Sequence, residues 1–101
     1  MKLTTKLRDM DGNEFADGAT LKAVIINALL TPLHGDDKKS GTDKMKLFRL
    51  AQKVHDGDDL TLPAEDVALI KERTGLAYAP LIVGRIWEAI DPAVGADEGR
   101  G

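Results

Sequence analysis

The sequence contains no cysteine, which excludes disulfide bonds and thiolate metal ligands. Aromatic residues make up only 4% of the chain, so we expect a core built mainly from leucine, isoleucine, valine and alanine. Long apolar runs are missing too: nothing approaches the ~20 residues of a membrane span, and the first residues lack the apolar stretch of a signal peptide. We therefore expect a cytoplasmic protein without a membrane partner.

The chain also lacks an excess of basic charge. Its 14 lysines and arginines are outnumbered by 17 aspartates and glutamates, a net charge of −3, whereas proteins that coat nucleic acid are usually basic. A length of 101 residues fits one globular domain. We expect this domain over residues 1–92, followed by a flexible tail of small and polar residues at 93–101.

The spacing of apolar residues predicts an α+β fold that is mostly α. Residues 2–8 alternate between apolar and polar, and Asp11-Gly12 follows as a turn, which predicts a strand or hairpin. A short strand is expected at 60–62. Helical spacing predicts helices over 21–31 after the N-cap Thr20, over 43–55 after Thr42, from Pro63 to a stop at Gly75, and from 80 to 91. The expected fold is an N-terminal strand or hairpin packed on about four short helices, with Phe48 on an inner face.

No catalytic or metal-binding motif is present. Ser40 is the only serine, and the chain has neither a phosphate-binding loop nor a dinucleotide fingerprint. The aspartate clusters at 9–13 and 56–59 lack the glycine and glutamate that complete an EF-hand loop. His34 and His55 lack the further ligands of a stable metal site. We expect no enzymatic activity, no metal and no cofactor.

The pattern of residues 66–88 predicts a helix, a turn at 74–76 and a second helix, which is the order of elements in a helix-turn-helix. Two details disagree with that motif. Lys71 occupies the position where a small residue usually packs, and Pro80 falls inside the expected recognition helix. On the exposed side of the second predicted helix, Arg85 is the only residue well suited to hydrogen-bond with base edges. A DNA-binding transcription regulator remains an alternative.

Charges are segregated along the chain. Lys46, Arg49 and Lys53 share one helical face, and residues 56–66 are mainly acidic. One interpretation is a solvated surface whose exposed ion pairs contribute about 0–1 kcal/mol each. The other is a bipolar surface that orients a charged partner.

Several apolar residues are candidates for a contact patch. Ile26 and Leu30 form a second stripe on the first helix, and Leu81 lies on the outer side of the last. They belong either to the core or to an exposed patch, where Tyr78 or Trp87 would supply an aromatic anchor for a partner or for self-association. The candidate interaction residues are Ile26, Leu30, Lys46, Arg49, Lys53, Tyr78, Leu81, Arg85 and Trp87.

The run LIKER at 69–73 and the run GLAYAPLIVG at 75–84, together with residues 3–12 and 24–30, resemble small uncharacterised proteins of tailed bacteriophages and prophages. The resemblance implies no catalytic residues. It implies a context in which short acidic proteins bind host or phage proteins as inhibitors, modulators or assembly helpers. We predict a non-enzymatic protein-binding module that modulates a host or phage complex in the host cytoplasm, with a virion assembly component as a second alternative.

Overall fold

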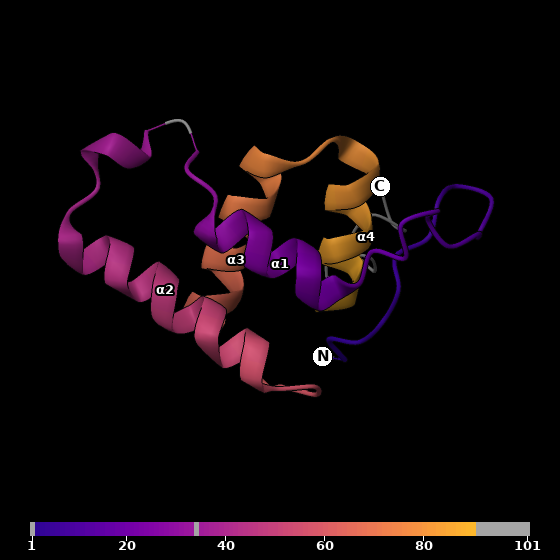
Figure 1. Ribbon diagram of the computed structural model, residues 1–101, viewed down its shortest axis with the longest axis horizontal. Coiled ribbons are helices and arrows are strands. Elements are labelled where there is room, and N and C mark those ends of the chain that lie inside the picture. The colour runs from indigo at the N-terminus through magenta and orange to yellow at the C-terminus, as the bar shows by residue number, and fades with distance from the viewer. Residues whose placement is uncertain (1, 34, 91–101) are drawn as a thin grey trace.

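A computed structural model of the chain describes residues 2–33 and 35–90 (Figure 1). These residues are mostly helical, as the sequence predicts. The elements in chain order are α1 (Leu21–Leu30), the short 3₁₀ helix η1 (Asp36–Lys38), α2 (Gly41–Asp56), α3 (Ala64–Ala77) and α4 (Pro80–Ile90). Helix α1 is central because it packs against both α2 and α3, while α4 packs against α3. The predicted tail at 93–101 and the candidate His34 lie outside the described residues.

Side chains cap two helix starts. Thr20 Oγ1 accepts a hydrogen bond from the Ala23 amide (3.2 Å), as expected for the N-cap of α1. Helix α2 begins earlier than predicted because Ser40, rather than Thr42, is its cap: Ser40 Oγ accepts from the Asp43 amide at 3.1 Å.

The predicted stop of α3 at Gly75 is wrong, since the helix continues to Ala77. Gly75 lies inside α3, next to Trp87 of α4. A Cβ atom at this position would lie 3.5 Å from the Trp87 indole, an ordinary van der Waals contact, so the packing of the two helices does not require a glycine here. Helix α4 begins at Pro80, where a proline is tolerated because the first turn needs no amide donor.

The predicted N-terminal strand and hairpin do not form a sheet in the part of the chain that the structure describes. Residues 2–20 make only isolated antiparallel bridges, and 60–62 are irregular. The alternation nevertheless identified the buried side chains, since Leu3 and Leu7 are both in the core. Their backbone groups pair with the start of α1 and with the loop before it: the Leu3 carbonyl accepts from Lys22, and the Leu7 amide donates to Ala19. A helix terminus therefore replaces the expected partner strand.

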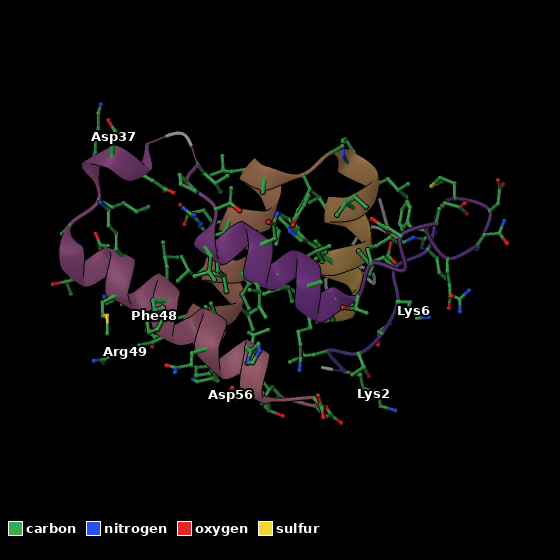
Figure 2. All side chains as sticks on the ribbon, in the orientation of Figure 1. Lys2, Lys6, Asp37, Phe48, Arg49 and Asp56 are labelled. Carbon is green, nitrogen blue, oxygen red and sulfur yellow. The ribbon has the colours of Figure 1, made fainter. Side chains whose placement is uncertain are left out.

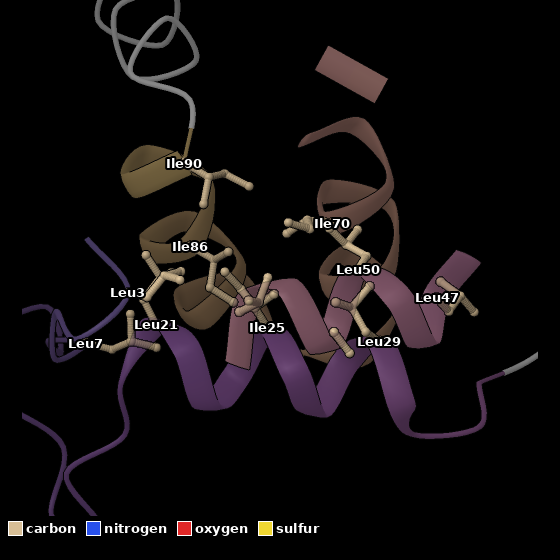
Figure 3. Packing of buried hydrophobic residues seen from close by; sticks show 12 residues of the cluster. Leu3, Leu7, Leu21, Ile25, Leu29, Leu47, Leu50, Ile70, Ile86 and Ile90 are labelled. Atoms are coloured by element: carbon tan, nitrogen blue, oxygen red, sulfur yellow. The ribbon is translucent and has the colours of Figure 1, made fainter. Parts of the chain in front are cut away.

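The core is aliphatic, as the scarcity of aromatics predicts (Figure 3). Each α-helix and the N-terminal segment contribute to it, whereas η1 has no buried residue. Its fully packed members are Leu3, Leu7, Leu21, Ile25, Leu29, Leu47, Leu50, Ala51, Val54, Ile70, Ile86 and Ile90.

Candidate functional site

The two aromatic residues proposed as contact anchors have internal roles. The Tyr78 hydroxyl donates to the Val24 carbonyl (2.8 Å) and accepts from the side-chain Nδ2 of Asn27 (2.9 Å). These bonds connect the end of α3 to α1. Trp87 Nε1 donates to Thr74 Oγ1 at 3.1 Å, and the Lys71 ammonium lies 5.2 Å from the centre of its ring. Both side chains are half-buried, so neither forms an exposed anchor.

Arg85 is also engaged within the chain. Its guanidinium donates to the backbone carbonyls of Arg8 (3.0 Å) and Asp9 (2.8 Å), and it lies 3.7 Å from the Glu88 carboxylate. The arginine that a helix-turn-helix would present to base edges therefore connects the loop at residues 8–14, here named the N-terminal loop, to α4.

The remaining apolar candidates divide between core and surface. Ile26 and Leu81 are half-buried, and Ile26 packs against the core. Leu30 is 53% exposed. Phe48, which the pattern predicts to face inward, is 48% exposed. The buried face of α2 is therefore narrower than the spacing of its apolar residues predicts.

The basic candidates line a groove of about 600 Å³ between α2 and α3. Lys46 and Arg49 are exposed and have no ion pair within the described chain, whereas Lys53 lies 3.4 Å from Asp66. The opposite wall is acidic and includes Glu65, Asp66 and Glu72. Part of the charge segregation in the sequence therefore lies across this groove, whereas Asp56, Asp58 and Asp59 of the acidic segment are not in its lining.

A second groove, here named the α1–α2 groove, has a volume of about 580 Å³ and a more apolar lining. Its apolar residues are Leu29, Leu30, Pro32, Leu33, Leu47 and Phe48, and its polar ones include Asp37 and Lys44. Figure 2 shows Phe48 on α2 and Asp37 on η1 at the same end of the molecule. The groove contains the two half-exposed apolar side chains, Leu30 and Phe48.

Arg73 and Asp36 also line this groove, and Arg73 stabilises its wall. The side chain is 2% exposed and donates three hydrogen bonds. It donates to the carbonyls of Ala28 and Thr31, each at 3.0 Å, and to Asp36 Oδ1 at 2.5 Å. Asp36 Oδ2 in turn accepts from the Leu33 amide at 2.7 Å. These bonds fix the loop between α1 and η1.

The electrostatics of the pair follow from these contacts. The hydrogen bond from Arg73, and after it the one from the Leu33 amide, lower the pKa of Asp36 from 3.8 to about 2. At neutral pH both groups are charged and paired. In the groove lining, the charge of Asp36 is therefore compensated by that of Arg73.

Sequence reasoning missed both members of this pair. For Arg73 a signal was present: it lies three residues after the buried Ile70, hence on the same face of α3. A charged residue on a core face is normally paired. For Asp36, one of several charges in a polar loop, the local sequence offered no comparable signal.

Comparison of the chain with protein-family models, with curated proteins and with solved structures found no match. Within residues 2–33 and 35–90, no three histidine, aspartate or glutamate side chains are grouped so that they could hold a metal ion. Over the same residues, no helix has the length and apolarity needed to cross a bilayer.

Proposed function

We propose that this chain is a non-enzymatic protein-binding module and that the α1–α2 groove is its contact surface. The observation that carries the proposal is the exposure of Leu30 and Phe48 in one apolar groove. Removing apolar surface from water contributes about 25 cal/mol per Å². An aromatic side chain beside an apolar groove is the kind of residue that concentrates binding energy at protein interfaces.

The Arg73–Asp36 pair supports the proposal in two ways. The bonds to Thr31 and Asp36 hold the groove wall in place before a partner arrives, so binding orders less of the chain. The pairing also means that a partner covering the groove does not desolvate an uncompensated carboxylate there.

The resemblance to small phage and prophage proteins supplies the biological context of the proposal. In that context the module acts in the host cytoplasm and inhibits or modulates a host or phage protein complex. The half-buried positions of Tyr78 and Trp87 shift the proposed contact away from them and towards Leu30 and Phe48.

Site-specific photo-crosslinking tests the proposal. A photoreactive phenylalanine analogue replaces Phe48 in one variant and Leu76 in another; Leu76 is also exposed but lies on α3, outside the groove lining. We expect a protein adduct in a bacterial lysate from position 48 and none from position 76. The purified partner should then bind wild type and the Met45→Lys control equally well, and bind Phe48→Lys at least about tenfold more weakly.

Met45 is a suitable control because it is also partly exposed on α2 but does not line the groove. Equal crosslinking from positions 48 and 76, or equal affinity of Phe48→Lys and wild type, would contradict the groove as the contact surface.

A further inference from the structure

The groove between α2 and α3 has one basic and one acidic side. The basic residues that α2 contributes to its lining, here named the basic wall, are Lys46, Arg49 and Lys53. The charged residues that α3 contributes to the described lining are all acidic, and this acidic wall consists of Glu65, Asp66 and Glu72. The one acidic residue that α2 adds is Asp43, which lies in the first turn, where the helix dipole favours a carboxylate.

Only one ion pair joins the two walls within the chain. Lys53 and Asp66 lie 3.4 Å apart across the groove. The other four wall residues are exposed and make no ion pair with any residue that the structure describes: Lys46, Arg49, Glu65 and Glu72. Helix α1 packs against both α2 and α3, whereas α2 and α3 make few direct contacts with each other, so the groove stays open between them. Each wall therefore keeps two charges that are available to a partner.

The two walls match each other in number of charges and in length. The basic wall runs from residue 46 to 53 and the acidic wall from 65 to 72, so each spans two helical turns, or ~10 Å. A two-fold axis that runs along the groove exchanges the two walls, which places the basic wall of one copy against the acidic wall of the other at both contacts. An axis across the groove would instead bring like charges together, which is unfavourable. The surface is therefore complementary to itself in one orientation.

We propose that the groove between α2 and α3 binds a second copy of this chain in a two-fold symmetric dimer, with each basic wall against the acidic wall of the other copy. The contact is isologous and closed, so it produces dimers and no larger assembly. Exposed ion pairs are individually weak, so we expect a dissociation constant on the order of 0.1–1 mM that rises with added salt. The α1–α2 groove uses other residues of α2, among them Leu47 and Phe48, and does not depend on this dimer.

Exchanging charges between the walls tests this arrangement by sedimentation equilibrium at low salt. Arg49→Glu makes the basic wall more acidic, and Glu72→Lys makes the acidic wall more basic. Each variant alone brings like charges together at both contacts, so its self-association should be at least about tenfold weaker than that of wild type. Their equimolar mixture should form 1:1 heterodimers, because opposite charges then meet at both contacts. The double variant Arg49→Glu/Glu72→Lys should self-associate again, since the two walls have only exchanged these charges.

Two control variants change the net charge by the same amounts at exposed positions outside the groove lining. Lys38→Glu and Asp11→Lys should each dimerise as wild type does, and their mixture should associate no more tightly. Circular dichroism should show that all variants are folded.

A wild type that stays monomeric at ~1 mM and low salt overturns the dimer, as does a mixture of Arg49→Glu and Glu72→Lys that stays monomeric. A mixture of the two control variants that associates as tightly as the mixture of the two wall variants also overturns it, because net charge alone would then explain the result. Crosslinking from position 48 to a different protein is independent of these outcomes, so the dimer can fail while the proposed function stands.

Discussion

Arg73 Nη1 and Asp36 Oδ1 lie 2.5 Å apart and join α3 to η1 across 37 positions of the sequence. The same guanidinium completes the end of α1. Within a helix, the Ala28 carbonyl would accept from the amide of residue 32, but residue 32 is a proline and has none. Arg73 Nε supplies the missing donor at 3.0 Å. One buried side chain therefore caps a helix and fixes the wall of the proposed contact groove.

Replacing Arg73 with methionine should destabilise the protein strongly. Methionine keeps much of the side-chain volume but leaves the Asp36 carboxylate and the Ala28 and Thr31 carbonyls without their donor. Leaving a buried hydrogen-bonding group without its partner typically costs about 1–3 kcal/mol, so we expect the loss of the two carbonyl contacts in Arg73→Met to lower the free energy of unfolding by about 2 kcal/mol or more. Urea titration followed by the fluorescence of Trp87, the only tryptophan, measures this change.

Arg49→Met is the matched control, because Arg49 is exposed and has no ion pair within the described chain. It should change the free energy of unfolding by less than about 0.5 kcal/mol. Equal effects of the two substitutions would show that the contacts of Arg73 do not stabilise the fold.

Asp36 should give the protein a specific sensitivity to acid. Its pKa is about 2 in the folded chain and near its ordinary value of 3.8 when unfolded. A lowered folded pKa stabilises the protein above the unfolded value, and this contribution is lost as the pH falls from about 4 towards 2. Asp36→Asn should therefore be less stable than wild type at pH 7, and the difference should shrink over that range. Urea midpoints measured from pH 7 to 2 report it.

The neighbouring Asp37→Asn is the control for this titration, since Asp37 is exposed and Arg73 bonds to Asp36 instead. It should follow the wild-type curve closely. A constant difference between Asp36→Asn and wild type at every pH would contradict the assignment of this acid sensitivity to Asp36.

Thr74 should be required for the packing of α4 on α3. Its buried hydroxyl donates to the Ile70 carbonyl (2.8 Å) and accepts from Trp87 Nε1. Thr74→Val keeps the shape but leaves the indole N–H without its acceptor, which should cost about 1–3 kcal/mol. Unfolding monitored by Trp87 fluorescence measures the loss. Thr74→Ser, which keeps the hydroxyl, should recover most of it, and equal losses in the two variants would show that the hydrogen bond is not the cause.

Helix positions were predictable from the sequence because they depend on short-range spacing and on local signals. The apolar stripe of α1, its cap Thr20 and the start of α3 after Pro63 all agree with the structure. The stop predicted at Gly75 was wrong because a glycine inside a helix costs only about 1 kcal/mol relative to alanine, so its presence alone does not end the helix.

The grooves were not predictable in this way. The exposure of Phe48 depends on how far α2 is covered by α1, and the position of η1 depends on the buried Arg73, which lies 37 residues away in sequence. The N-terminal alternation correctly marked Leu3 and Leu7 as buried, but a period of two does not specify the pairing partner. Here that partner is the start of a helix and not a second strand.

Arg85 should control the order of the N-terminal loop. Arg85→Gln removes the donors to the Arg8 and Asp9 carbonyls, so we expect faster hydrogen exchange at the Asp9 and Gly12 amides, which bond within the loop. Exchange in α2 should not change, because these bonds are local. Glu88→Gln, which removes only the 3.7 Å contact to Arg85, should leave the loop protected. If both variants exchange alike, Arg85 does not hold the loop. If Arg85→Gln instead weakens binding to duplex DNA while the loop stays protected, that result would favour the DNA-binding alternative, which the contacts of Arg85 within the chain do not support.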